Sequence, residues 1–475
     1  MWSRLVTPLD PAAAAARLRA KGGTKGRAGG PGRRPGLALL DSAMRHDTLG
    51  RHSYLAADPF GTFRVRGGQA SWNGAPVPGA PLDALRAVLA PYRTEPDPDL
   101  PPFQGGAIGF IAYDFGASLE RVAPPARRAG LTDDLAVNLY ATIVAFDHRA
   151  GTCRLIATGF PETDPGARAR KAASDLDALE AALSGPEPTP EAAPVAALAW
   201  RSNFTAETYA RAVERVRDYI RAGDIYQANI SQRFEAALPP GFDAFAFYRR
   251  LRARNPAPFA AYLEVDGLIV ASSSPERFLR LDGRQVETRP IKGTAPRSAD
   301  PAEDRARAEA LAANAKERAE NVMIVDLLRN DLSRICAPHS VAVPTLCGLE
   351  TYAGVHHLVS AVTGTLREGA DGLDLLAATF PGGSITGAPK LRAMDIITEI
   401  EGDARELYCG AIGWIGFDGS LDTSIAIRTV LMDETRAVLQ AGGGVTLLSD
   451  PEAEYRETLT KAERVLAAFA SGEAA

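Results

Sequence analysis

Apolar residues along the chain follow two different periods. Short runs in the first third, LALLDSA, GTFRVRG, GGAIGFIAYDF and LYATIVAFD, read as strands, as do VHHLVSAVTGTL, SIAIRTVLMD and AVLQAGGGVTLL later on. Residues 206–223 instead have helical apolar spacing and end on glycine, and further helices are predicted over 301–335 and 451–470. Because strands and helices are grouped rather than strictly alternating, the pattern predicts an α+β fold with extensive antiparallel sheet.

Two segments break this pattern. The run SGPEPTPEAAPVAALAW (184–200) has no period and predicts a linker between an N-terminal domain, 1–183, and a second domain, 201–475. The basic, glycine-rich run 20–36 fits a flexible surface insertion better than a nucleic-acid arm, because the chain carries a net charge of −5. No nucleic acid is therefore expected as a partner.

The composition is that of a globular protein, with 46% apolar and 23% charged residues. No apolar run reaches the roughly 18 residues of a membrane span, so no membrane association is expected. The four cysteines form no CxxC pair, and such sparse use suits a reducing, cytoplasmic setting.

Two pairs of acidic residues are candidates for a metal site. Glu317 and Glu320, and likewise Glu454 and Glu457, are three residues apart on predicted helices, so each pair shares one helix face. Such pairs are also common on solvated helices. If the four carboxylates converge, they repel one another unless a cation lies among them, and Mg²⁺ prefers oxygen ligands.

Glycine-rich segments are candidates for anion binding. FPGGSITGAPK passes from a loop into a helix, which places free backbone N–H groups near Ser384. QAGGGV offers Gly442, Gly443 and Gly444 after a strand, as a nest for a carboxylate. The alternative for each segment is a tight turn or a bulge.

Several polar residues interrupt apolar runs. Arg428 lies within SIAIRTVLM, where burial would require an anionic partner. His356 and His357 should face opposite sides of a strand, so at most one faces a given site. Lys292, between Pro-Ile and Gly-Thr in ETRPIKGTAPR, can be a solvated residue, an anion clamp or a nucleophile.

Seven segments together resemble one family. GDIYQANISQRF, SSSPERF, TRPIKGTAPR, AENVMIVDLLRNDLSRI, FPGGSITGAPK, DTSIAIRT and QAGGGV occur in the order found in chorismate-utilising enzymes, strongly over about 203–468. The resemblance implies a large α/β sandwich of two sheets with helices outside, and an active site that needs Mg²⁺.

Two positions indicate a branch of that family. Gln227 stands where the water-using branch, which forms isochorismate and salicylate, has a lysine base. The anthranilate-forming branch resembles PIAGT where this chain reads PIKGT, and a lysine there is typical of the branch that forms 4-amino-4-deoxychorismate for folate synthesis. The resemblance therefore makes Lys292 a covalent nucleophile. The alternatives are an anthranilate-forming component and a non-catalytic chorismate-binding subunit.

The resemblance also implies roles for other residues. Glu276 of SSSPERF would be the acid for the leaving hydroxide, and Thr294 and His357 would lie near the substrate ring. The residues implied to contact substrate carboxylate or side-chain oxygens are Ser384, Tyr408, Arg428, Gly442, Gly443, Gly444 and Lys461.

Two partners follow as well. No cysteine lies in a GxCxG setting, so ammonia is expected from a separate glutamine amidotransferase subunit. LALLDSA loosely resembles the tryptophan-pocket element of anthranilate synthases, which makes tryptophan a candidate ligand.

Overall fold

The computed structural model describes residues 1–20, 34–44, 49–186, 188, 197–352 and 354–470. Most of the predicted insertion at 20–36 and much of the predicted linker at 184–200 lie outside these ranges. None of the helices within them is long and apolar enough to cross a membrane. All four cysteines are buried and carry free thiols.

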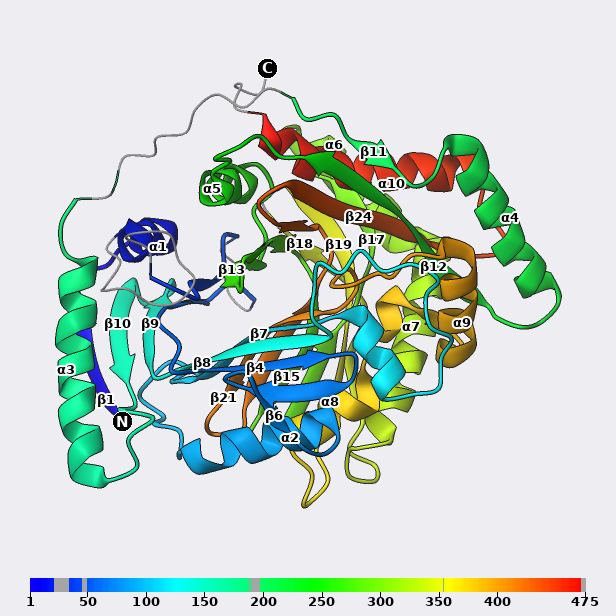
Figure 1. Cartoon of the computed structure of the whole chain (residues 1–475). Helices are drawn as coiled ribbons and strands as arrows, with labels where there is room; N and C mark the ends of the chain where they lie inside the picture. Colours follow the sequence, from blue (N-terminus) through cyan, green and yellow to red (C-terminus); the bar gives the residue numbers. More distant parts are fainter. Residues whose placement is uncertain (21–33, 45–48, 187, 189–196, 353, 471–475) are drawn as a thin grey trace.

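The described strands form two sheets of twelve strands each, with antiparallel pairing (Figure 1). The first has the order β1 (Trp2–Val6), β10 (Thr152–Ala157), β9 (Thr142–Asp147), β3 (His52–Ala56), β2 (Ala38–Asp41), β13 (Phe259–Val265), β14 (Leu268–Ser274), β23 (Thr429–Met432), β24 (Arg436–Val445), β12 (Gln227–Ala237) and β11 (Arg201–Ser202), with β20 (Gly387–Ala388) beside β12. The second has the order β17 (Ile291–Pro296), β19 (Val355–Thr365), β16 (Gln285–Arg289), β15 (Arg277–Asp282), β22 (Leu421–Ile425), β21 (Ala411–Gly416), β7 (Gly106–Ile111), β8 (Leu135–Tyr140), β4 (Gly61–Arg66), β5 (Gln69–Trp72) and β6 (Ala75–Val77), with β18 (Ala342–Thr351) beside β19.

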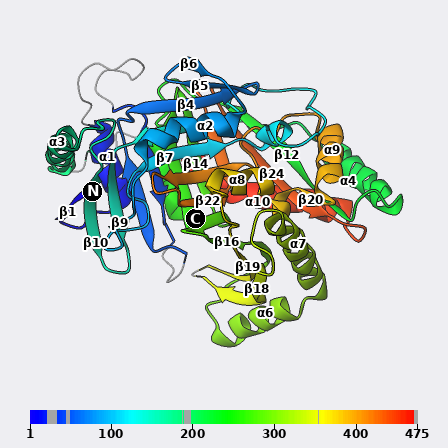
Figure 2. The same cartoon turned by 90° about the horizontal axis from the view of Figure 1, so that it is seen from below.

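Helices surround the sheets. They are α1 (Pro11–Ala20), α2 (Pro81–Leu89), α3 (Pro165–Leu183), α4 (Ala206–Arg221), α5 (Ala244–Arg254), α6 (Pro301–Ala313), α7 (Ala315–Ser333), α8 (Gly372–Thr379), α9 (Lys390–Glu401) and α10 (Pro451–Leu466), with the short 3₁₀ turns η1 (Ala90–Tyr92), η2 (Tyr113–Ser118), η3 (Gly383–Ile385) and η4 (Ala467–Phe469). Figure 1 shows α2, α3, α4 and α10 at the periphery, and in Figure 2 α6 projects with β18 from one side. The predicted α+β sandwich with outer helices is confirmed.

Strands from both predicted domains meet in each sheet. In the first sheet β2 pairs with β13, and in the second β7 pairs with β21. Both sheets are therefore continuous across residues 184–200, while the domain boundary itself stays a prediction.

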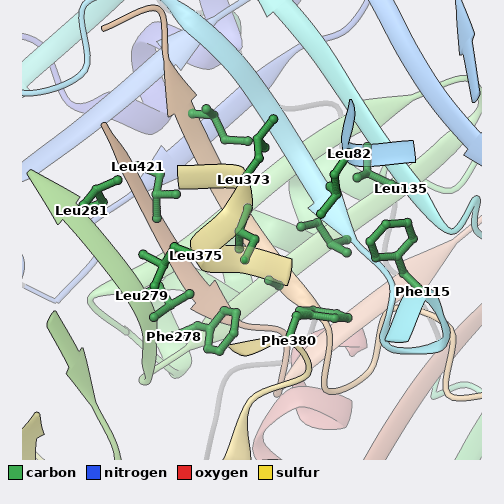
Figure 3. Packing of buried hydrophobic residues seen from close by; sticks show 14 of the residues in the cluster. Leu82, Phe115, Leu135, Phe278, Leu279, Leu281, Leu373, Leu375, Phe380 and Leu421 are labelled. Atoms are coloured by element: carbon green, nitrogen blue, oxygen red, sulfur yellow. The ribbon is translucent and has the colours of Figure 1, made fainter. Parts of the chain in front are cut away.

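A buried apolar cluster packs α8 against the second sheet. Leu373 and Leu375 of α8 pack with Leu279 and Leu281 of β15 and with Leu421 of β22 (Figure 3). A fully buried leucine contributes about 1.5–3 kcal/mol by leaving water, so this cluster holds the strand that follows Glu276 firmly in place.

Two apolar runs that were expected to be single strands are each divided between the sheets. LYATIVAFD gives β8 in the second sheet and β9 in the first, and SIAIRTVLM gives β22 in the second and β23 in the first. Periodicity did not reveal the breaks because both halves of each run are buried and apolar.

The helix expected over 301–335 is also two helices. Asn314 ends α6 and begins α7, where its side chain accepts hydrogen bonds from the backbone N–H groups of Lys316 and Glu317. Asparagine favours such caps because its side chain replaces the missing intrahelical partner. The break gives the helix that carries Glu317 and Glu320 its own direction.

Candidate active site

Lys292 lies on an irregular part of β17. The strand pairs Lys292 with Leu358 and Thr294 with His357 on β19, and the register shifts between these pairs. Gly293 at the shift has a φ of +77°, which glycine adopts readily, and an added Cβ would lie 3.0 Å from Leu311 and 3.2 Å from Glu317 Oε2. Lys292 and Gly293 thus lie at a bulge within the strand.

Ser384 joins Lys292 to Glu276. The Lys292 Nζ lies 3.4 Å from the Ser384 carbonyl oxygen, and the Ser384 hydroxyl donates to Glu276 Oε1 at 2.6 Å. Glu276 is 6% exposed, and this burial raises the pKa of its carboxyl, although the Ser384 hydrogen bond, Lys292 and Arg428 oppose the shift. The amine of Lys292 and the protonatable carboxyl of Glu276 thus both contact Ser384.

His357 faces the same side as Thr294. Its Nδ1 and the Thr294 hydroxyl share a hydrogen bond of 2.8 Å. Burial, and then the positive charge of Arg428, lower the pKa of His357 to about 4, so the ring is neutral near pH 7. His356 faces the other way, toward Asp304 and Thr351, which confirms the alternation predicted for the two histidines.

Arg428 lies at the crossover between β22 and β23 rather than inside a strand. Its φ is +51°, which is uncommon outside glycine. Its carbonyl accepts from the Ser273 N–H at 3.1 Å, whereas no described residue forms an ion pair or hydrogen bond with its guanidinium. Burial lowers the pKa of Arg428, and Glu276 opposes this. The guanidinium is therefore available to an anionic ligand.

The three glycines predicted to form a nest belong to β24 instead. Gly442 pairs with Ser231, Gly443 with Ile230 and Gly444 with Asn229, as in a regular ladder. None has a positive φ, so the expectation of a nest is wrong. Glycine is needed here for close approach, because a Cβ on Gly442 would lie 2.4 Å from the backbone carbonyl oxygen of Ile230.

Lys461 of α10 reaches the edge of β24. Its ammonium donates to the Gly442 carbonyl at 2.8 Å and pairs with Glu457 Oε1 at 2.6 Å. In the described chain β23 pairs with β24 only as far as Leu439, so the backbone near Gly442 is open on that side.

The two acidic pairs approach the site from two helices. A Cβ on Gly443 would lie 3.1 Å from Glu454 Oε2 and 3.3 Å from Glu457 Oε1, so both carboxylates of α10 converge on one point. On α7, burial raises the pKa of Glu320, and the negative charges of Glu317 and Glu454 raise it further. The sequence separations did not reveal that these pairs lie in one electrostatic environment.

Lysines relieve part of the repulsion that was expected among these acids. Lys316 pairs with Glu320 at 3.9 Å, and Lys461 lowers the pKa of Glu457 although burial opposes the shift. Among the described residues, no three acidic, histidine or cysteine side chains are close enough to enclose an ion. The donors nevertheless suit Mg²⁺, which takes one or two carboxylates and keeps its waters.

Sequence reasoning missed two buried polar residues, Arg405 and Asn321, that lie behind residues of the site. Tyr408 is 7% exposed, and the guanidinium of the buried Arg405 lies 5.6 Å from the centre of its ring. On α7, Asn321 donates to the Leu358 carbonyl at 3.3 Å and accepts from the Ser360 hydroxyl. The sequence carried no signal for either residue, since Arg405 lies between Asp403 and Glu406 and Asn321 follows Glu320, as residues on a solvated surface also do.

A separate cavity of about 830 Å³ lies between the two sheets. Its lining includes Leu40 and Asp41 of LALLDSA, Tyr54, Trp414 and Arg277. The Asp41 carboxylate accepts from Tyr248 at 3.0 Å and from Arg252 at 2.5 Å, so its charge is already paired.

Replacing Glu276 by glutamine should lower turnover about 10²- to 10⁴-fold, the usual contribution of a positioned acid. It should also change how stability depends on pH. Because the folded pKa of Glu276 is raised, wild type loses stability as pH rises from about 4.3, the ordinary value, through the folded value. The melting temperature of Glu276→Gln relative to wild type should rise over that window.

Thermal unfolding between pH 4 and 9 measures this difference. Glu452→Gln is the control, since the Glu452 side chain is 72% exposed and pairs only with Arg456 on the same helix. A difference for Glu276→Gln that stays constant with pH would show that the carboxyl does not titrate in this window.

The fold and this site place the chain in a known family. The model of the chorismate binding enzymes matches residues 40–467, so the chain belongs to that family. Aminodeoxychorismate synthase component 1 of Salmonella typhimurium is 41% identical over 438 residues, which cover 91% of this chain and 92% of that protein. The chain is a chorismate-utilising enzyme of the aminodeoxychorismate or anthranilate synthase type.

Overall similarity does not separate these two types. Anthranilate synthase component 1 of Mycobacterium bovis is 40% identical over 463 residues, covering 93% of this chain and 89% of that protein. The crystal structure of anthranilate synthase component I from Streptococcus pneumoniae TIGR4 has a TM-score of 0.78 and 31% identity, covering 95% of this chain and 96% of that one. The choice between them depends on individual site residues.

Proposed function

We propose that this enzyme converts chorismate and ammonia into 4-amino-4-deoxychorismate, in the cytoplasm and in the 4-aminobenzoate branch of folate synthesis. The observation that carries the proposal is the placement of Lys292, whose amine lies 3.4 Å from the carbonyl of Ser384, the residue that also binds Glu276. A nucleophile and an acid that both contact the same serine suit a substitution in which a hydroxyl group must be protonated to leave.

The first displacement forms a bond between Lys292 Nζ and C2 of the chorismate ring. The two ring double bonds shift, the C4–O bond breaks, and Glu276 gives its proton to the departing hydroxyl, which leaves as water. The amine must be unprotonated to attack carbon.

The second displacement reverses the double-bond shift. Ammonia attacks C4 and the bond between C2 and Lys292 breaks, so that the lysine leaves as a neutral amine. The new ammonium at C4 then gives one proton to the Glu276 carboxylate, which restores the acid. Two successive displacements leave the amine on the face from which the hydroxyl departed, which a single displacement does not.

Other residues would hold the substrate. The guanidinium of Arg428, which has no hydrogen-bond or ion-pair partner among the described residues, suits a carboxylate. The hydroxyl of Tyr408, Lys461 and the open backbone edge near Gly442 suit one as well. Glu317, Glu320, Glu454 and Glu457 would hold Mg²⁺, which when bound supplies positive charge for a chorismate carboxylate. Neutral His357 and Thr294 would lie beside the ring.

Ammonia would come from a glutamine amidotransferase subunit. The name component 1 of the relatives implies a second component for those enzymes. No segment of this chain has the nucleophilic cysteine setting of a glutaminase, and its four cysteines are buried.

The test is to incubate the purified chain with chorismate, Mg²⁺ and ammonium and to identify the product by mass. We expect 4-amino-4-deoxychorismate, which retains the enolpyruvyl group. Anthranilate with release of pyruvate would assign the chain to the other branch, and unchanged chorismate would indicate a non-catalytic subunit.

The source of nitrogen is tested by replacing ammonium with glutamine. The chain alone should form no amino product from glutamine, because it has no group that releases ammonia from an amide. Product formation from glutamine at a rate comparable to that from ammonium would contradict the need for a partner subunit.

The cavity between the sheets is the candidate site for tryptophan. Its aromatic lining, in which the Tyr54 and Trp414 rings lie 6.2 Å apart, suits an aromatic ligand. Calorimetric titration with tryptophan, with and without chorismate, would show whether it binds.

A further inference from the structure

Arg405 is the largest side chain that is fully buried, with 1% of its surface exposed. It lies in the segment between α9 and β21. Taking a guanidinium out of water is costly unless its donors are satisfied, and removing one partner of such a buried pair is strongly destabilising. A buried arginine at this place therefore needs an explanation.

Its guanidinium donates four hydrogen bonds to three segments of the chain. On one side, Nε and NH2 form a fork on Glu401, at 2.9 Å to Oε2 and 2.7 Å to Oε1. On the other side, NH1 donates to the Ile385 carbonyl at 3.1 Å and NH2 to the Asn229 carbonyl at 2.5 Å. The rings of Tyr113 and Tyr408 lie 4.8 and 5.6 Å from the guanidinium carbon.

The hydrogen bond to Ile385 connects Arg405 to the site. Ile385 follows Ser384, whose carbonyl and hydroxyl contact Lys292 and Glu276. The Tyr408 N–H donates to the carbonyl of Arg405 itself at 2.9 Å.

Glu401 extends the connection to β24. Its Oε1 also accepts from the N–H and hydroxyl of Ser231, at 2.7 and 2.9 Å. Ser231 pairs with Gly442, whose carbonyl receives Lys461.

We infer that Arg405 is a positioning residue which, together with Glu401, fixes the Ser384 turn against β12 and Tyr408. The inference rests on the proposed function only in that Lys292 and Glu276 act on chorismate. The planar fork of an arginine can satisfy two carbonyls and a carboxylate at once, whereas a lysine ammonium is a compact charge on a flexible stem. The identity of this residue, and not only its charge, sets the geometry.

Arg405→Lys tests this by keeping the charge beside Glu401 while losing the fork. Chorismate consumption with saturating ammonium and Mg²⁺ should fall about 10²-fold, as small misplacements of reacting groups do. Arg19→Lys is the matched control, since Arg19 also lies between two carboxylates, Asp243 and Glu264 at 3.0 and 3.2 Å, and near an aromatic ring. The control should stay within about twofold of wild type, as expected where no site residue is contacted.

A double-mutant cycle with Ser384→Ala separates positioning from loss of folded protein. If Arg405 acts through the Ser384 turn, the fold losses of activity of the two single variants will not multiply in the double variant. Arg405→Lys will then have little further effect in the Ser384→Ala background. If Arg405→Lys only reduces the fraction of folded molecules, its loss of activity will be multiplied by that of Ser384→Ala in the double variant. Melting temperatures show directly whether each variant is folded. If Arg405→Lys does not fold, the paired replacement Arg405→Met with Glu401→Met removes both charges and enters the same cycle.

Multiplicative losses, or activity of Arg405→Lys close to wild type, would overturn the inference. Because the assay follows consumption of chorismate, its outcome does not depend on which amino product forms. A wild-type chain that forms anthranilate would thus refute the proposed product and leave this test intact.

Discussion

Replacing Lys292 by alanine should abolish any covalent adduct between the chain and chorismate. In wild type, protein trapped during turnover should carry the added mass on the peptide that contains PIKGT. The variant recreates the PIAGT pattern, and its product should shift toward 2-amino-2-deoxyisochorismate or anthranilate, because Glu276 and Arg428 remain and ammonia can attack C2 directly. Formation of 4-amino-4-deoxychorismate should fall by about 10² or more, as for loss of a covalent nucleophile.

Lys292→Arg separates a nucleophile from an anion clamp. Arginine keeps the positive charge but stays protonated, so it cannot attack carbon. If Lys292 is only an anion clamp, Lys292→Ala should bind chorismate more weakly, wild type should form no adduct, and Lys292→Arg should restore part of the activity. Robust formation of the 4-amino product by Lys292→Arg would overturn the covalent role. Lys171→Arg serves as the control, since Lys171 pairs with Asp175 on α3 and contacts no site residue.

Replacing Glu320 or Glu457 by glutamine should cut turnover by about 10²- to 10⁴-fold, the scale on which a metal stabilises charge in a reaction. Folding should be little affected, because burial already raises the pKa of Glu320 and a neutral side chain relieves repulsion from Glu317 and Glu454. Chelation of divalent metal should abolish the activity of wild type, and added Mg²⁺ should restore that activity. Each variant should need more Mg²⁺ for half-maximal activity, which a purely structural defect would not cause.

Matched controls exist on the same two helices. Asp326→Asn on α7 and Glu452→Gln on α10 remove carboxylates whose side chains are 79% and 72% exposed. Both controls should keep wild-type turnover and Mg²⁺ dependence. A glutamate whose replacement leaves turnover and Mg²⁺ dependence unchanged does not belong to the metal site.

The sequence by itself determined the kind of fold and the chemistry of individual residues. Period-2 runs predicted antiparallel strands, and the same period placed His356 and His357 on opposite faces, as the structure confirms. The helical spacing of 206–223 corresponds to α4, which ends before Gly223. These features depend on neighbours in the chain, so local pattern is sufficient to predict them.

Only the tertiary structure decided which residues meet. Ser384 is 108 residues from Glu276 and 92 from Lys292, and strand pairing and packing bring the three together. A glycine run fits a nest or a closely packed strand equally well, and the regular pairing of Gly442, Gly443 and Gly444 with β12 shows that the run is a strand here. An apolar run likewise does not indicate at which residue the chain passes from one sheet to the other, because both halves of the run are buried. The same holds for Arg405: its charge is plain in the sequence, but its burial and its partners depend on contacts between distant segments.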